Sequence, residues 1–120
     1  MLRLTRPRQL LRFEYLALLV LAFTIYWDRE ESWLLFALLI LAPDLSFIAA
    51  IAGPESGILA YNIAHTAIGP ATLAVIGIFV DWDLGITLAL IWFAHIALDR
   101  VVGYGLKYSL DKGDTHIGRI

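Results

Sequence analysis

Four apolar segments, each long enough to cross a lipid bilayer, dominate this chain of 120 residues. They cover about residues 10–27, 33–52, 57–80 and 84–102, and a transmembrane helix needs about 17 to 25 residues. Only short polar connectors separate them, and short links between helices imply antiparallel neighbours. The sequence therefore predicts an all-α, single-domain fold: a transmembrane up-down four-helix bundle followed by a tail over 103–120.

The composition supports the membrane class. Hydrophobic residues make up 60% of the chain, charged residues only 17%, and the mean hydropathy is +0.76, whereas a soluble domain carries about 25% charged residues. The absence of Cys excludes thiol catalysis and thiolate metal sites. A net charge of -2 gives no reason to expect a nucleic-acid partner. The partner that this composition indicates is the lipid bilayer.

The basic residues indicate an orientation. Eight of the nine Lys and Arg residues lie near the start of the first segment, or at the end of the fourth segment and beyond; only Arg29 lies in the opposite loops. By the positive-inside rule, this distribution predicts that both termini are cytoplasmic. Trp27, Trp33 and Trp82 gather at the other face, where an aromatic belt belongs. We therefore expect a multi-pass protein of the inner (plasma) membrane.

Charged and titratable side chains interrupt the apolar segments. Asp44 lies in an otherwise uncharged stretch, and such a charge at the bilayer centre costs about 2.5 to 3.5 kcal/mol on insertion scales. Glu14, His65, His95 and Asp99 are also embedded in apolar sequence. At a rise of about 1.5 Å per helical residue, all five fall in the cytoplasmic half of the bundle. This asymmetry predicts one shared site near the cytoplasmic face.

Local spacing strengthens that prediction. His95 and Asp99 are four residues apart and share a helix face, so the carboxylate can fix the imidazole tautomer or join it as a ligand. Pro43 precedes Asp44, and Pro70 follows His65 by five residues. Each proline removes a backbone N–H donor, and the freed carbonyls must find other partners within a membrane. A small hydrated cavity at this depth is the expected result.

The carboxylates and imidazoles form a mixed nitrogen and oxygen set that suits Zn, Mn or Fe. The candidate metal ligands are Glu14, Asp44, His65, His95 and His116. His116 reaches the site only if the tail folds back, and terminal segments are by default poorly ordered. Asp44 and Asp99 are the candidate catalytic residues, with Asp99 orienting a ligand or acting as a base. No HExxH or EF-hand spacing occurs, so the prediction of a divalent metal rests on the shared depth of these residues alone.

Three polar features have simpler explanations. Glu14 can pair with the neighbouring Arg12 at the membrane interface. Arg100 is expected to extend to the cytoplasmic headgroups. The Gly103-Tyr104-Gly105 stretch is expected to end a helix, because two glycines alone are a weak signal for a phosphate-binding loop.

Three strings of residues carry a family resemblance: Tyr61-Asn62-x-x-His65-Thr66 with Pro70; His95-x-x-x-Asp99-Arg100-x-x-Gly103-Tyr104-Gly105-Leu106-Lys107-Tyr108; and Asp114-Thr115-His116-Ile117-Gly118. Together with Arg12-x-Glu14 and Pro43-Asp44, they resemble a family of small bacterial integral membrane proteins catalogued as domain of unknown function 4260. The resemblance implies a four-helix membrane protein without an established activity. It also implies that the polar residues and the tail belong to one pattern.

A looser likeness is to membrane-bound metal-dependent hydrolases, on Pro43-Asp44 and Thr115-His116 alone, and an analogy of this kind does not establish a reaction. Three functions stay open. The first is a metal-dependent membrane hydrolase acting on a lipid or phosphorylated small molecule at the cytoplasmic leaflet. The second is a proton- or cation-coupled small transporter or channel component, and the third a structural or interaction protein whose polar residues only join helices. The sequence is also compatible with a homo-oligomer.

Overall fold

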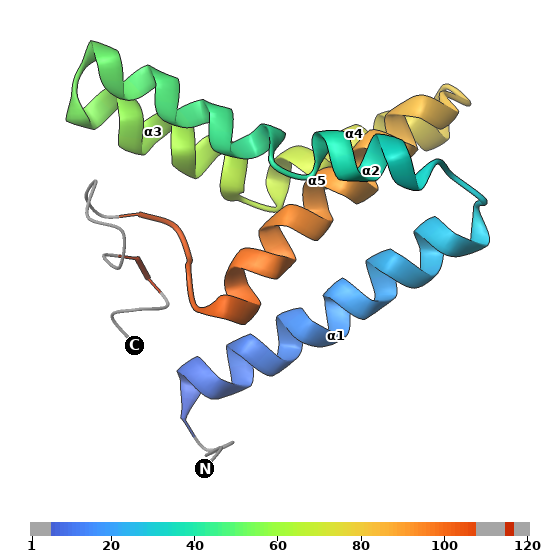
Figure 1. Ribbon diagram of the computed structural model, residues 1–120, viewed down its shortest axis with the longest axis horizontal. Helices are drawn as coiled ribbons and strands as arrows, with labels where there is room; N and C mark the ends of the chain where they lie inside the picture. Colours follow the sequence, from blue (N-terminus) through green and yellow to red (C-terminus); the bar gives the residue numbers. More distant parts are fainter. Residues whose placement is uncertain (1–5, 108–114, 117–120) are drawn as a thin grey trace.

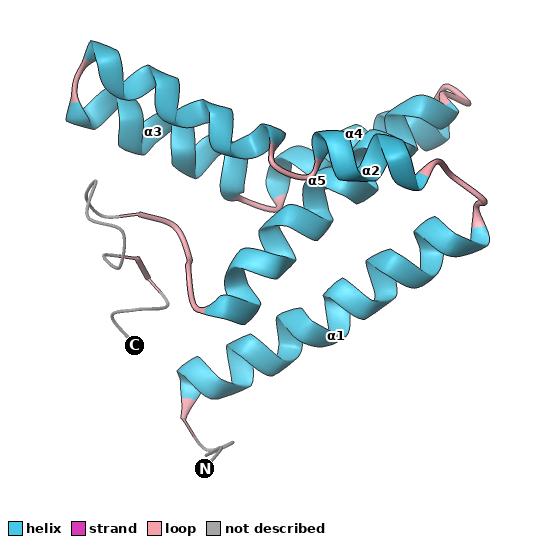
Figure 2. Cartoon of the chain, viewed as in Figure 1, coloured by secondary structure: helices cyan, strands magenta, loops and turns pink. Residues whose placement is uncertain are grey.

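The computed structural model describes residues 6–107 and 115–116 of the chain. Within this part, five α-helices and one 3-10 helix account for the regular structure, apart from an isolated β-bridge between Lys107 and Thr115 (Figures 1 and 2). The elements follow in the order α1 (Pro7–Asp28), α2 (Trp33–Leu39), η1 (Ala42–Ala52), α3 (Pro54–His65), α4 (Ile68–Phe79) and α5 (Asp83–Val102). The predicted all-helical class is confirmed.

Among the described residues, three stretches are long and apolar enough to cross a membrane: Pro7–Asp28, Trp33–Ala52 and Asp83–Val102. Helices α3 and α4 meet at a bend of 44°, and they make a fourth if the pair is one broken span. The surface of these segments is apolar, with Ile51 89% exposed and Phe79 83% exposed. Exposed apolar area on this scale suits lipid better than water, so the fold is that of a membrane protein.

Two of the predicted spans are broken rather than continuous. In the second, α2 ends at Leu39, two residues form a turn, and the chain continues as the 3-10 helix η1. Pro43 lies at the start of η1, where its missing N–H and its ring prevent the α-helical hydrogen bonds from continuing. In the third, Thr66 adopts extended backbone angles (φ -93°, ψ 145°) and ends α3.

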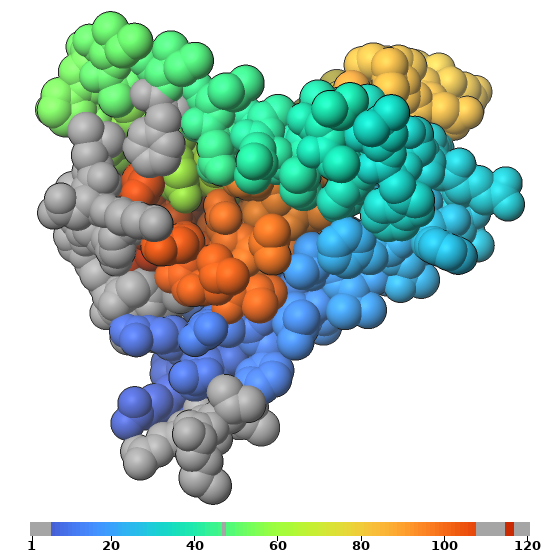
Figure 3. Space-filling model, viewed as in Figure 1, coloured from blue at the N-terminus to red at the C-terminus, as the bar shows by residue number. Residues whose placement is uncertain are grey.

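Helix α5 organises the packing. It packs chiefly against α1 and α4, whereas η1 packs against α3 as a helical hairpin (Figure 1). A small core forms where Leu19 of α1 meets Ala94 and Ala97 of α5. The hairpin of η1 and α3 and the tip between α4 and α5 diverge as two arms with a notch between them (Figure 3). The broken segments turn at the base of these arms.

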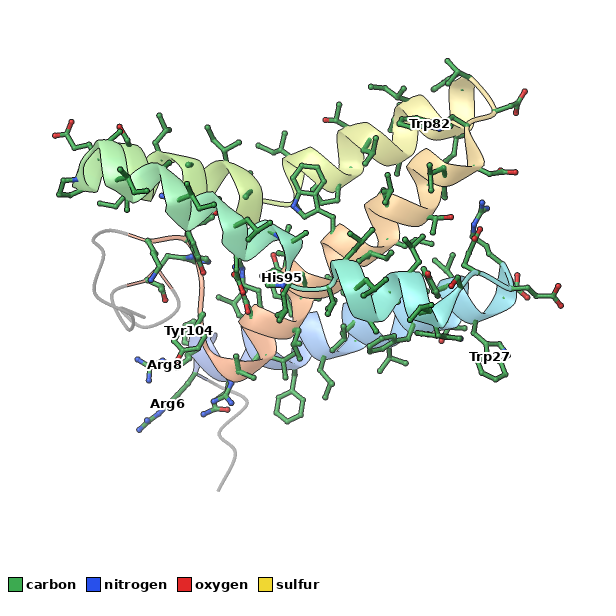
Figure 4. The ribbon with its side chains drawn as sticks, turned by 45° about the horizontal axis from the view of Figure 1, so that its top comes forward. Arg6, Arg8, Trp27, Trp82, His95 and Tyr104 are labelled. Atoms are coloured by element: carbon green, nitrogen blue, oxygen red, sulfur yellow. The ribbon has the colours of Figure 1, made fainter. Side chains whose placement is uncertain are left out.

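The ends of the helices differ in chemistry. Arg6, Arg8 and Tyr104 lie at one end and Trp27 and Trp82 at the opposite end, with His95 between them (Figure 4). At the Trp end, an ion pair of 3.4 Å joins Arg29 to Asp83 and so links the α1 and α5 termini. Gly103 ends α5 in the left-handed region (φ 105°), a conformation that glycine adopts readily. The predicted helix end at Gly103 is therefore present.

Candidate metal centre

Four side chains from three segments converge beside the two helix breaks. One oxygen of Asp44 lies 3.1 Å from Nε2 of His65 and 3.1 Å from Nε2 of His95. The two Nε2 atoms are 3.0 Å apart, and Oδ2 of Asp99 is 3.5 Å from the first and 3.3 Å from the second. One ligand atom from each residue falls within 4.8 Å of the others.

Backbone hydrogen bonds determine which nitrogen of each imidazole carries a proton. Nδ1 of His65 lies 2.8 Å from the carbonyl oxygen of Tyr61, and Nδ1 of His95 lies 2.6 Å from that of Ile40. A carbonyl oxygen only accepts hydrogen bonds, so both Nδ1 atoms donate. In the neutral rings, both Nε2 atoms then present lone pairs to each other and to the carboxylates. Such an arrangement repels itself unless a cation or added protons lie between the groups.

The helix breaks leave carbonyl groups free, and α5 supplies their donors. His95 donates to the Ile40 carbonyl at the end of α2. The indole Nε1 of Trp92 donates to the Ala64 carbonyl, and Nη2 of Arg100 donates to the His65 carbonyl at 2.8 Å. These bonds satisfy backbone groups that would be costly to leave unpaired in a membrane. The bonds made by the His95 ring and to the His65 carbonyl also hold these two residues in position, as outer hydrogen bonds do for the ligands of metal sites.

Arg100 does not extend to the membrane surface as the sequence suggested. The residue is only 3% exposed, and besides the His65 bond its Nη1 donates to the Tyr104 carbonyl at 3.3 Å. Its guanidinium lies 5.6 Å from the centre of the Tyr15 ring, which allows a cation–π contact. The broken end of α3 presents a free carbonyl to Arg100, and this partner draws the side chain inward.

The segment after α5 returns to α3 beside His65. Asn62 accepts from the backbone N–H of Lys107 at 2.6 Å and donates to the Lys107 carbonyl at 2.9 Å, so its amide pairs with this segment as a neighbouring strand would. The Tyr61 ring stacks on the His65 ring, with centroids 3.8 Å apart. The ammonium of Lys107 lies 4.9 Å from the centre of the Tyr61 ring. This segment therefore packs against the Tyr61 ring, which in turn stacks on His65.

Thr115 and His116, the two residues beyond 107 that the structure describes, lie against the segment after α5, as expected for a tail that folds back. Thr115 is fully buried, and Nδ1 of His116 accepts a hydrogen bond of 2.7 Å from the backbone N–H of Leu106. Burial lowers the pKa of His116, and the positive charge of Arg100 lowers it further. A side chain at Gly105 would collide with the His116 ring, because a Cβ there would lie 2.3 Å from Nδ1.

The structure brings together four of the six predicted site residues, namely Asp44, His65, His95 and Asp99. His116 is engaged with Leu106 and is not among the four. Glu14 is exposed on α1 and lies outside the group as well. A ligand role for Glu14 or His116 stays a prediction.

Sequence reasoning did not find three contributors to the site. Nothing in the sequence distinguished Trp92 from the other apolar residues of its span, yet its indole N–H donates to the Ala64 carbonyl at the broken end of α3. The carbonyls of Ile40 and Tyr61 orient the imidazoles, and a backbone group gives no signal in side-chain patterns. Gly69 packs against the Trp92 ring, with which a Cβ would collide, but a lone glycine does not identify that neighbour in the sequence.

A family model matches the chain over residues 8–120 and is described as Domain of unknown function (DUF4260). No curated protein and no solved structure matches the chain.

Proposed function

The chain belongs to the DUF4260 family, and we propose that it is a metal-dependent hydrolase of the inner (plasma) membrane with its site near the cytoplasmic face. Asp44, His65 and His95 hold one divalent metal ion, Zn, Mn or Fe. Asp99 acts as the base or completes the ligand set. Glu14 and His116 stay outside the ligand set in this proposal.

One observation carries the proposal: both imidazoles direct Nε2 lone pairs at the same point, because both Nδ1 atoms donate to backbone carbonyls. Zinc bonds of about 2.0 to 2.2 Å to nitrogen and oxygen imply ligand separations of about 3.3 to 3.6 Å in a tetrahedron. Five of the six separations among the four candidate ligand atoms range from 3.0 to 3.5 Å, and all six lie within 4.8 Å. A divalent cation would turn the repulsion among these groups into attraction.

The exposures of the ligands suit catalysis. The side chains of His65 and His95 are 0% and 2% exposed, whereas that of Asp44 is 46% exposed. The centre is therefore enclosed on the imidazole side and accessible on the Asp44 side, as a catalytic metal with an open position requires. When bound, the metal supplies Lewis-acid chemistry and acidifies water. Asp99, 19% exposed, is placed to accept the proton.

The orientation rests on charge. Arg6 and Arg8 lie at the Tyr104 end of the helices, and Trp27 and Trp82 lie at the other end (Figure 4). This separation supports the proposal that the termini are cytoplasmic, and with that orientation the centre belongs to the half of the protein that the cytoplasmic leaflet surrounds. In this proposal the four spans form an up-down bundle, and its second and third members are broken.

A second candidate is proton or cation transfer. The contact of 3.0 Å between the two Nε2 atoms is short enough for a shared proton, and intramembrane His and Asp residues often form proton relays. A relay needs polar groups toward the far face, however, and among the described residues the cluster is formed only where α5 meets the two breaks. We therefore place hydrolysis first.

The deciding experiment measures metal in the purified protein. The chain is produced with a purification tag free of histidine, extracted in detergent without chelator, and analysed by inductively coupled plasma mass spectrometry. We expect one Zn, Mn or Fe per chain, lost in Asp44→Asn. Proton flux into liposomes without bound metal would favour the relay. Wild-type metal content and wild-type complementation by Asp44→Asn and His95→Gln would reduce the cluster to a structural role.

A further inference from the structure

An apolar groove adjoins the candidate metal centre. It has a volume of about 390 Å³, and its lining includes Ala42, Pro43 and Ser46 of the second segment, Ala64 and Leu73 of the third, and Trp92 of α5. Pro43 immediately precedes Asp44, and Ala64 immediately precedes His65. The lining comes from both arms that diverge in the space-filling view (Figure 3). The lining of the groove therefore includes the sequence neighbours of two candidate metal ligands.

The groove carries a single polar feature without a partner. The hydroxyl oxygen of Ser46 is buried and makes no hydrogen bond, and Ser46 lines the groove two residues after Asp44. A buried polar atom of this kind normally has a partner. An apolar cavity with one or two placed polar groups is the usual form of a ligand site. The Ser46 hydroxyl thus indicates an occupant that is mostly hydrocarbon and carries a hydrogen-bond acceptor.

We propose that the groove binds an acyl chain of a membrane lipid, with the ester or phosphate group of that lipid at the metal centre and its acceptor oxygen on Ser46. This inference rests on the proposed function and names its substrate class. Hydrocarbon chains surround a broken span in a bilayer, so the occupant needs no route through water. Its polar end would reach the centre beside Asp44, the ligand with the most exposed side chain.

The test uses the full chain in lipid nanodiscs and a phosphatidic acid with a diazirine on one acyl chain. After illumination, peptide mass spectrometry locates the adducts. We expect saturable labelling, competed by unlabelled phosphatidic acid, at residues 42–46, 64 and 92. Ala42→Phe fills the groove and should lower labelling about tenfold, equivalent to about 1.4 kcal/mol. Ser46→Ala removes one hydrogen bond and should lower lipid affinity about fivefold.

A neighbouring residue provides a matched control. Leu73 lines the groove, whereas Ala74 lines a second apolar cavity of about 310 Å³ between α1, α4 and α5. Leu73→Trp should reduce labelling as Ala42→Phe does, and Ala74→Phe should leave it unchanged. Because Leu73 is distant in sequence from the ligands, Leu73→Trp keeps the test valid if Ala42→Phe fails to fold. Each variant is first checked for metal content and for a single species in size-exclusion chromatography.

The outcomes separate this inference from the proposed function. Saturable labelling blocked by Leu73→Trp in a protein without metal would support the lipid site and overturn the metal-dependent reaction. Bound metal with labelling that is unsaturable, maps elsewhere or ignores both filling variants would overturn the lipid site alone. Dimers of the chain cross-linked through the groove would show that a second copy covers it, and would also overturn the inference.

Discussion

Helix α5 runs unbroken from Asp83 to Val102, whereas the α2–η1 and α3–α4 segments each lose their regular hydrogen bonds beside a site residue. The unbroken helix contributes side-chain donors, and the broken segments contribute free carbonyls that receive them. Neither arrangement would build the centre alone, since an exposed carbonyl is costly in a membrane and an unpaired donor is too. The contrast indicates that the breaks are part of the site.

The largest effect is expected from removing a ligand on the unbroken side. His95→Gln deletes an Nε2 lone pair and keeps a polar side chain of similar length. Metal affinity should fall by more than about 100-fold, beyond the loss of 10- to 100-fold typical for outer-shell partners. Competition with a fluorescent chelator measures the constant.

Glu14→Gln and His116→Gln are the controls for this prediction. Both positions were ligand candidates in the sequence, and both variants should keep wild-type affinity because the structure places them outside the cluster. Loss of metal in either one would restore that residue to the ligand set.

A smaller loss is expected where α5 supports the broken α3. Arg100→Gln removes the donor to the His65 carbonyl. His65 is then held less firmly in its orientation toward the metal position, and metal affinity should fall about 10- to 100-fold. Arg12→Gln is the matched control, because Arg12 donates to the Val101 carbonyl, which belongs to no ligand. Equal effects of the two variants would mean that Arg100 contributes only general stability.

Restoring helical continuity tests the break itself. Pro43→Ala returns a backbone N–H and lets α2 extend, so that the N–H of Asp44 can compete with His95 for the Ile40 carbonyl. Metal affinity should fall about tenfold, at the lower end of outer-shell effects. Pro70→Ala should change little, because Pro70 lies in the first turn of α4, where N–H groups lack helical partners. A Pro43→Ala protein with unchanged affinity would separate the break from the site.

The sequence predicted the side chains of the centre better than its scaffold. Asp44, His65, His95 and Asp99 were recognisable because a titratable group in an apolar span is costly and therefore rare. Pro43 and Pro70 predicted loosened backbone, but the turn after Leu39 and the extended Thr66 required knowing which carbonyls α5 could satisfy. Such pairings join residues far apart in the chain and leave no periodic pattern. The prediction that Arg100 extends to the headgroups was wrong for the same reason, because its partner, the His65 carbonyl, is distant in the chain.

The smallest effect concerns the tail. His116 accepts from the Leu106 N–H through Nδ1, so a proton on that atom breaks the contact. The pKa of His116 is lowered below the ordinary 6.5 in the folded protein, and the unfolded chain therefore binds more protons in this range. Stability of the tail should be constant above pH 6.5 and decline as the pH falls below it.

Hydrogen exchange of the Leu106 amide measures that decline. In His116→Gln the decline with pH should disappear, because glutamine does not titrate. A decline that persists in this variant would assign it to another group.

The unequal exposure of the ligands has a consequence for how the centre fills. A cation arriving at this centre would meet Asp44 before the imidazoles. The Asp44 side chain is 46% exposed, whereas the His65 and His95 side chains are almost inaccessible. The Asp44 carboxylate would thus be the first group to bind an entering cation and the last to release a leaving one. In a protein loaded with metal, Asp44 would then govern the rate of metal exchange, and the buried histidines would mainly govern the equilibrium constant. Asp44→Glu would change how quickly the centre loads and empties more than how tightly it holds its ion.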